Sequence, residues 1–344
     1  MGKLTLQEIA RQLNVSRITV SKVINNKPGV SEETRRKVIQ KLIASEYKWI
    51  NAACSLPDEL KEEEEVKYIA VVAVAPEFSE FWLKIIKAVS DALADSGYEC
   101  IHSFLSRDEE NRFILPKIIN TKRISGLIAV NVYDDAIIQE LCQTEIPAVF
   151  LDVTPNAFLQ SLKGDLILLE GTRSIAEITG HILKKGRREI GFIGDTTYSQ
   201  TILERWGGFC SAMTLNGLAV NEKFCCTEGF SGHFYYAEEI ERALDGLEIL
   251  PEAIVCANDF IAFMVIDYLH RRGLKVPEDV AVSGYDDIRE KITAQSSLTT
   301  VAIDTGLLGK RLVRQLVTRI DDPSMPYEII YIKSNAVFRS STDF

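Results

Sequence analysis

The sequence lacks the residue arrangements that build catalytic or metal centres. Its four histidines, at positions 102, 181, 233 and 270, are far apart. Its seven cysteines are odd in number and scattered, without a Cys-x-x-Cys pair or a zinc-type Cys/His spacing. No GxSxG, HExxH or P-loop motif occurs. We therefore expect no enzyme activity, no metal and no cofactor, with the cysteines reduced and mostly in the core.

Long apolar runs are also missing. The segment VKYIAVVAVA at 66–75 has the length of a strand, well short of the roughly 20 residues that a membrane helix needs. The N-terminal residues contain no apolar signal core. We expect a cytoplasmic protein that makes no contact with a membrane.

Charge is divided unevenly along the 344 residues. Residues 1–50 contain ten Lys or Arg and four Glu, a net charge of +6, whereas the whole chain has a net charge of −10. A small basic head on a large acidic body is typical of a tethered nucleic-acid reader, because the body repels DNA that the head does not select. The length predicts two or three hydrophobic cores.

The head contains the signals of three short helices. Thr5 and Glu8 have the spacing of a capping box, Ser16 is expected to cap a helix over 17–24, and Ser31 is expected to cap one ending near 45. Asn14-Val15-Ser16 supplies a tight turn between the first two helices. This pattern predicts a helix-turn-helix whose second helix enters the major groove. An ordinary helical bundle is the alternative, but the caps, the turn and the charge agree on a DNA reader.

From residue 66 onward, apolar runs alternate with amphipathic stretches. The runs predict strands at 68–75, 98–104, 125–131, 147–152, 189–194, 253–257, 279–284, 298–303 and 328–332. The stretches predict helices at 79–95, 108–121, 171–185, 200–216, 233–246, 258–273 and 304–320. This alternation indicates parallel sheets covered by helices, and the number of units indicates two sheets with a cleft between them.

The head residues carry a family resemblance. The segment 5–47, TLQEIARQLNVSRITVSKVINNKPGVSEETRRKVIQKLIASEY, is similar to the DNA-binding domain of the LacI/GalR repressor family. The α/β body fits that family's periplasmic-binding-protein-like core. The resemblance implies a small all-α helix-turn-helix domain at 1–48, a hinge and acidic linker at 49–65, and an effector-binding core of two Rossmann-like subdomains at 66–344. The expected subdomain limits are about 66–163 and 297–325 for the first, and about 164–296 and 326–344 for the second.

The resemblance also implies which residues contact DNA. The family's base readers correspond to Arg17, Ile18 and Lys22; an arginine suits guanine, an isoleucine suits a thymine methyl, and a phosphate contact is equally open for Lys22. Phosphate contacts set the register of a protein on DNA. The remaining candidates in the head are Thr5, Ser16, Thr19, Ser21, Asn25, Ser31 and Thr34.

The family's hinge motif maps onto residues 47–56. Ala53 and Leu56 match the motif, and the resemblance implies that Leu56 wedges into the minor groove. Cys54 stands where the family has an arginine, and the acidic run DELKEEEE follows at 58–65. We expect operator binding that is weaker and more sensitive to salt than is usual in the family.

Polar residues at the predicted strand ends indicate an effector site, because α/β sheets bind ligands there. The family's ligand motifs correspond to Glu204-Arg205-Trp206-Gly207, Ala257-Asn258-Asp259 and Gly284-Tyr285-Asp286-Asp287. A structural role, such as capping by Asp286 or internal pairing of Arg205, is the alternative. The candidate effector-binding residues are Ser79, Phe81, Asp152, Arg205, Phe230, Asn258 and Asp286.

The sequence thus predicts a repressor of a sugar-utilisation operon that its sugar releases. A co-repressor mode, with a nucleobase or another metabolite as effector, is the alternative, and a solute sensor without a DNA role is less favoured. We expect a homodimer on a pseudo-palindromic double-stranded operator, because one helix-turn-helix contacts little DNA. The chain ends without an apolar heptad tail, which favours a dimer over a tetramer.

Overall fold

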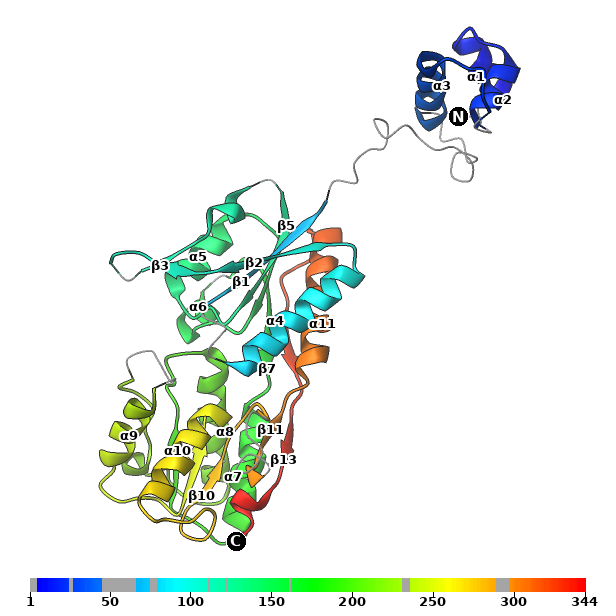
Figure 1. Cartoon of the computed structure of the whole chain (residues 1–344). Helices are drawn as coiled ribbons and strands as arrows, with labels where there is room; N and C mark the ends of the chain where they lie inside the picture. The colour runs from blue at the N-terminus through cyan, green and yellow to red at the C-terminus, as the bar shows by residue number, and fades with distance from the viewer. Residues whose placement is uncertain are drawn as a thin grey trace. The chain divides into compact units, whose positions relative to one another are not determined.

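The computed structural model of the chain describes residues 5–24, 27–44, 66–74, 79–110, 112–121, 123–160, 162–230, 236–288 and 297–344 (Figure 1). The chain forms two compact units, Met1–Val66 and Lys67–Phe344. We call them the head and the core and describe each by itself. No helix in the described ranges is both long enough and apolar enough to cross a membrane.

The head consists of α1 (Leu6–Gln12), α2 (Arg17–Ile24) and α3 (Glu32–Ala44), as the caps predict. Asn14 lies in the turn between α1 and α2 with a φ of 53°, a left-handed conformation that asparagine tolerates better than most residues. The small side chain of Ala10 lets the two helices approach. The apolar faces of the three helices meet in one buried cluster, formed by Ile9, Ala10, Val20, Val23, Val38, Ile39 and Leu42.

The first lobe of the core is built on a six-stranded sheet in the order β12-β7-β6-β5-β1-β2, with every neighbouring pair parallel. The strands are β1 (Tyr68–Ala73), β2 (Glu99–Phe104), β5 (Ile124–Val130), β6 (Ala148–Leu151), β7 (Asp165–Leu169) and β12 (Ile329–Ile332). Helices cover both faces, as the alternation of runs predicts (Figure 1). They are α4 (Glu80–Asp95), α5 (Asp135–Gln143), α6 (Pro155–Leu159) and α11 (Thr305–Asp321).

Strand β1, which lies between β5 and the edge strand β2, explains this layering. Ile69 and Val71 belong to one buried cluster together with residues of α4 and α11. Ala70 and Val72 belong to a second cluster together with residues of α5 and α6. Successive side chains of a strand point to opposite faces, so a strand without polar interruptions requires an apolar layer on each side.

The second lobe contains a parallel three-stranded sheet in the order β10-β9-β8. Its strands are β8 (Ile190–Ile193), β9 (Ala253–Cys256) and β10 (Ala281–Ser283), and β11 (Thr300–Ala302) pairs antiparallel with β13 (Asn335–Val337) beside it. In this lobe α7 packs along α8, and α9 packs along α10 (Figure 1). These helices are α7 (Thr172–Lys184), α8 (Gln200–Leu215), α9 (Ala237–Asp245) and α10 (Asp259–Arg271).

The chain crosses between the lobes three times within the described residues, near 170, 303 and 333. The expected limits at 164 and 326 each fall one strand too early, because β7 and β12 pair with each other inside the first sheet. The expected limit at 296 is also early, because Thr299 and Ala302 form bridges to Ser283 and Asp286 of the second lobe.

The helix expected over 108–121 is wrong. This segment contains β4 (Phe113–Ile114), which pairs with β3 (Ser106–Arg107), and the short 3₁₀ helix η3 (Lys117–Asn120). The Asp108 carboxylate accepts hydrogen bonds from the backbone N–H groups of Glu110 and Arg112, at 2.9 and 2.8 Å. Such local bonds compete with helical ones and close a turn instead. Neither α5 nor β7 was predicted.

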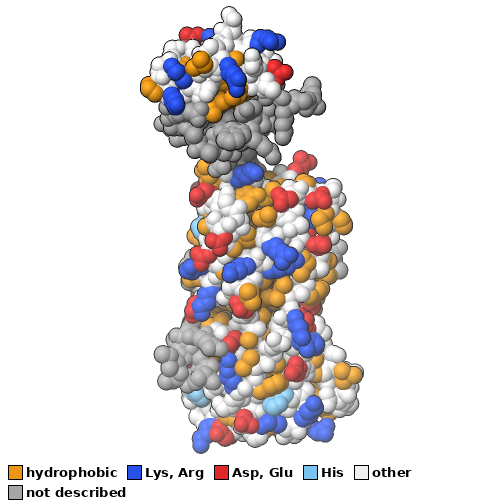
Figure 2. Space-filling view, turned by 90° about the vertical axis from the view of Figure 1, so that its right-hand side faces the viewer, with side chains coloured by type: hydrophobic (Ala, Val, Ile, Leu, Met, Phe, Trp, Pro, Cys, Tyr) orange, Lys and Arg blue, Asp and Glu red, His pale blue; other side chains and the backbone are white. Residues whose placement is uncertain are grey.

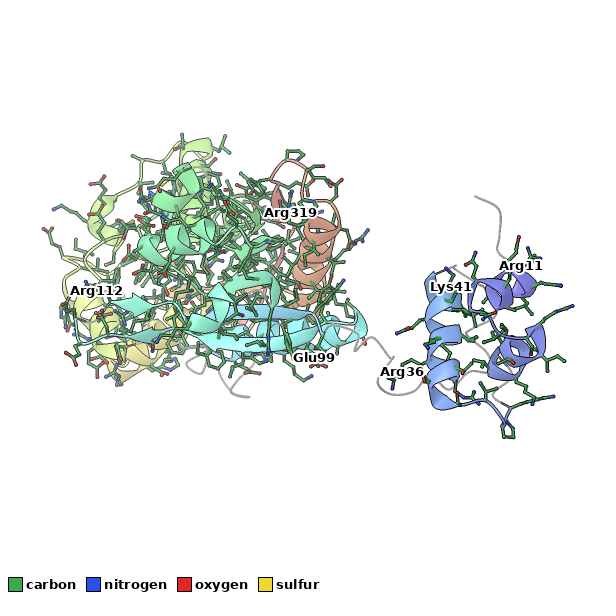
Figure 3. All side chains as sticks on the ribbon, turned by 90° about the horizontal axis from the view of Figure 1, so that it is seen from above. Arg11, Arg36, Lys41, Glu99, Arg112 and Arg319 are labelled. Carbon is green, nitrogen blue, oxygen red and sulfur yellow. The ribbon has the colours of Figure 1, made fainter. Side chains whose placement is uncertain are left out.

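A buried ion pair fastens α11 to the first sheet. Arg319 on α11 (Figure 3) donates from Nη2 and Nε to the two carboxylate oxygens of Asp165, at 2.7 and 3.1 Å. Gln315 and the backbone N–H of Glu328 also donate to this carboxylate. The Arg319 side chain is 4% exposed and that of Asp165 is fully buried, so neither charge can be solvated if its partner is removed.

Arg319→Met should destabilise the core by about 3–5 kcal/mol, because it leaves the Asp165 carboxylate buried without its cation. The measurement is the urea midpoint of the core's unfolding transition. Arg314→Met, on the exposed side of the same helix, is the matched control and should change stability by less than about 0.5 kcal/mol. Equal midpoints for the two variants would contradict this role of the pair.

Candidate functional site

The described surface of the head presents basic and apolar side chains (Figure 2). Arg17 is exposed in the first turn of α2, and its neighbour Ile18 is 69% exposed although it is apolar. Ser21 and Lys22 are half-buried on the same helix. An exposed isoleucine beside an arginine has the chemistry of a surface that reads base edges.

Hydroxyl groups cap the helices of the head. Ser16 Oγ accepts a hydrogen bond of 3.0 Å from the N–H of Thr19, and Ser31 Oγ accepts one of 3.3 Å from the N–H of Thr34. Thr5 and Glu8 form the expected capping box. The structure thus gives Thr5, Ser16 and Ser31 capping roles, and their contact with DNA stays a prediction. Asn25, Ala53 and Leu56 lie outside the described residues.

A cavity of about 70 Å³ lies between the two lobes of the core. The structure brings six of the seven predicted effector-binding residues to its lining. The first lobe contributes Ser79, Phe81 and Asp152, and the second contributes Arg205, Asn258 and Asp286. The cavity therefore depends on both lobes, as the predicted cleft requires.

Phe230 does not line this cavity. The expectation that it lies beside the other six candidate residues is therefore corrected. It lines a separate cavity of the second lobe together with Trp206, Cys226 and Arg242. Cys226 forms an isolated β-bridge with Ile193 at the end of β8, and Arg242 and Ala243 of α9 line the same cavity as Phe230. The sequence indicated an aromatic residue here but not which cavity its ring lines.

Asp152 links the two lobes. It follows β6 with a φ of 62°, and its carboxylate accepts hydrogen bonds from the hydroxyl and the backbone N–H of Thr201 on α8. Tyr133 donates to the same carboxylate at 3.2 Å, and the N–H of Gln200 donates to the carbonyl of Val153 at 2.7 Å. Burial raises the pKa of Asp152, while the hydrogen bonds from the Thr201 hydroxyl and the Val153 N–H and the charge of Arg205 act to lower it.

Arg205 places a buried cation on the second-lobe side of the cavity. It is 5% exposed, donates from Nη1 to the carbonyl of Ala257 at 2.7 Å, and stacks with Cζ 3.6 Å from the centre of the Tyr285 ring. Its Nε is buried and has no hydrogen-bond partner among the described residues.

Asp286 supplies the facing carboxylate. It is half-buried, has a φ of 115°, and donates its backbone N–H to the carbonyl of Val301 at 3.0 Å. Burial raises the pKa of Asp286 to about 8; Arg205 lowers it and the nearby Asp259 adds to the rise. Burial likewise raises the pKa of Asp259 to about 6. With a pKa of about 8, the Asp286 carboxyl is mostly protonated at neutral pH.

Asn258 combines two roles. Its Oδ1 accepts a hydrogen bond of 2.9 Å from the N–H of Ile261 and so caps α10. Its amide nitrogen provides two further donors at the lining of the cavity. The structural alternative and the ligand role are therefore compatible for this residue.

Aromatic rings cover much of the cavity wall. Phe81 and Trp82 meet edge to face with centroids 5.0 Å apart, and Tyr133 of the first lobe lies 4.6 Å from Tyr198 of the second. Sequence reasoning missed Asn131, Tyr133 and Tyr198 as lining residues. The signal was present, because Asn131 and Tyr133 directly follow a buried strand, as Asp152 does.

Comparisons with known proteins bear on both units. Residues 5–48 match the family model "Bacterial regulatory proteins, lacI family", and residues 179–342 match "Periplasmic binding protein-like domain". The chain is 28% identical over 344 residues to the HTH-type transcriptional repressor PurR of Glaesserella parasuis serovar 5 (strain SH0165), and 29% identical over 342 residues to the repressor of that name from Haemophilus influenzae (strain PittEE). In both comparisons 98% of each protein is covered.

Solved structures share the fold. The complex of the transcriptional regulator CelR with cellobiose has a TM-score of 0.69 at 21% identity, covering 98% of this chain and 99% of that one. The lac repressor dimer bound to operator and the anti-inducer ONPF has a TM-score of 0.66 at 22% identity, covering 99% of both. The predicted fold class, a helical head and a periplasmic-binding-protein-like core, is confirmed.

Asp286→Asn should flatten the dependence of core stability on pH. Because the pKa of Asp286 is about 8 in the folded chain and about 3.9 in an unfolded one, the stability that its neutral form contributes is complete below about pH 4 and is lost as the pH rises towards 8. Asparagine is neutral throughout, so the melting temperature of the variant should fall less between pH 5 and pH 9.

The control for this experiment is Asp322→Asn. Hydrogen bonds from Ser324 lower the pKa of Asp322, so that group contributes stability that disappears only in acid, and its variant should follow the wild type from pH 5 to pH 9. Parallel curves for Asp286→Asn and the wild type over that range would show that the Asp286 carboxyl does not titrate there.

Proposed function

The chain belongs to the lacI family of bacterial regulatory proteins and is a DNA-binding transcriptional repressor, and we propose that a sugar-like effector in the core cavity controls its affinity for an operator. The observation that carries the proposal is the pairing, in one chain, of the exposed Arg17 and Ile18 with a cavity lined by both lobes of the core. A ligand held by two lobes can change the angle between them, provided it binds one arrangement more tightly.

The chemistry of the lining supports a sugar. The carboxyl groups of Asp152 and Asp286 offer acceptor oxygens, and the Nε–H of Arg205 and the amide of Asn258 offer donors. Vicinal hydroxyl groups need such mixed partners, because each hydroxyl both donates and accepts. The rings of Phe81, Trp82 and Tyr198 offer apolar faces to the C–H side of a sugar ring.

The rings of Tyr133 and Tyr198 favour a second candidate, a nucleobase that acts as co-repressor. They lie 4.6 Å apart at an angle of 46° and come from different lobes, so a flat heteroaromatic ring can displace one and stack on the other. The amides of Asn131 and Asn258 suit the donor and acceptor edges of a base. A binding experiment separates the two classes of effector.

We propose a homodimer that reads a pseudo-palindromic operator in the cytoplasm and catalyses no reaction. The lac repressor, which shares the fold, is a dimer on its operator in the structure compared above. Two-fold symmetry matches two heads to two half-sites.

Arg17→Ala should weaken operator binding by about 1–3 kcal/mol, roughly 5- to 150-fold, because it removes a side chain suited to guanine. Fluorescence anisotropy with duplexes from the region upstream of the gene measures the affinity at fixed salt. Lys37→Ala is the control, since Lys37 is exposed on α3 and already paired with Glu33. If the wild type shows no sequence-specific DNA binding, with or without effector, the proposal that the protein is a repressor is refuted.

Asp286→Ala should weaken binding of the sugar effector at least about tenfold, because it removes a half-buried acceptor. The effector is first sought in a thermal-shift panel. The panel contains monosaccharides and disaccharides, including ribose and cellobiose, and the nucleobases adenine, guanine and hypoxanthine. Calorimetry then measures the affinity of the compound that binds. Phe230→Ala is the control and should bind within about threefold of the wild type. A full response of Asp286→Ala would exclude this cavity, and stabilisation by nucleobases alone would favour the second candidate.

A further inference from the structure

The effector cavity and the three crossings between the lobes meet at one dipeptide. We propose that Tyr285, together with the backbone of Asp286, is the positioning element that couples occupancy of the cavity to the angle between the lobes. This inference rests on the proposed function, because the occupant that it couples is the effector. Tyr285 itself does not line the cavity.

Tyr285 adjoins two residues that line the cavity. The guanidinium of Arg205 lies over its ring at 3.6 Å, and Asp286, the next residue, lines the cavity. Arg205 and Asp286 are the cation and the carboxylate with which the second lobe faces a ligand. A ligand that pulls on either group therefore acts on the ring or on the backbone of Tyr285.

The hydroxyl of Tyr285 reaches the first and third crossings. It donates to the carbonyl of Glu170 at 2.7 Å and lies 2.9 Å from Ser334 Oγ, which itself donates to the same carbonyl at 3.1 Å. Glu170 follows β7 and Ser334 follows β12. Tyr285 is fully buried, so water does not replace these bonds when they stretch.

The backbone beyond Tyr285 holds the second crossing. The N–H of Asp286 donates to the carbonyl of Val301, and the N–H of Asp287 donates to Thr300 Oγ1 at 3.3 Å. Both aspartates have positive φ, 115° and 52°, which costs free energy that surrounding contacts must supply. A shift of the Asp286 carboxylate thus disturbs β11 directly before the chain crosses.

Arg205 adds a steric contact at the first crossing. A Cβ placed on Gly171, directly after Glu170, would lie 2.6 Å from Cγ of Arg205. The arginine therefore packs against bare backbone there. Each of the three crossings therefore contacts Arg205, Tyr285 or Asp286, which either line the cavity or adjoin a residue that does. Packed contacts of this kind switch between discrete arrangements instead of deforming smoothly.

Tyr285→Phe tests the coupling because it keeps the ring under Arg205 and removes only the hydroxyl. Tyr268→Phe is the matched control: Tyr268 is also buried in the second lobe, and its hydroxyl donates to Asp245 at 2.7 Å, away from the crossings. Hydrogen exchange on the full chain without sugar should show about tenfold faster exchange around Glu170 and Ser334 in Tyr285→Phe only. Unchanged exchange at both crossings would overturn the proposal.

The second arm uses the sugar that gives the largest thermal shift in the panel above. In Tyr285→Phe its dissociation constant should stay within about threefold of the wild type, while its effect on operator affinity should fall about tenfold. An equal loss in Tyr268→Phe, or an unchanged effect in Tyr285→Phe, would refute the coupling role. If no sugar in the panel binds, the sugar proposal fails, and the exchange experiment alone decides the role of Tyr285.

Discussion

The buried guanidinium of Arg205 is the constraint on which the rest of the effector site depends. A cation without solvent must find compensation inside the protein, and here it finds the carbonyl of Ala257 and the face of the Tyr285 ring. These needs fix the position of α8 relative to the ends of β9 and β10. They also leave the Nε–H of Arg205 without a partner among the described residues.

Backbone strain gathers around the same cavity. Asn131, Asp152 and Asp286 each follow a strand, each has a positive φ, and each lines the space between the lobes. Chains leaving parallel strands must turn sharply at the sheet edge, and small polar residues accept the conformations that this requires. The ends of the strands thus provide both the turns and the polar groups of the site.

Much of the fold and of the site is predictable from local patterns. The helices of the head follow from their caps. The place of Asp152 at the cavity follows from its position after a predicted strand, and those of Arg205, Asn258 and Asp286 follow from family motifs. Their contact with an effector stays a prediction. The helix over 108–121 fails because the side chain of Asp108 bonds its own backbone. The subdomain limits fail because an apolar run such as Asp165–Leu169 does not reveal which sheet it joins.

The sequence by itself determined the class of the protein, the order of its elements and the residue types at the site, because caps, periodicity and motifs act over a few neighbouring residues. Only the tertiary structure decided that Phe230 lies in another cavity, that Tyr133 meets Tyr198, and that Tyr285 joins Glu170 to Ser334. Those contacts join residues far apart in the chain, and their formation depends on the packing of whole layers against one another.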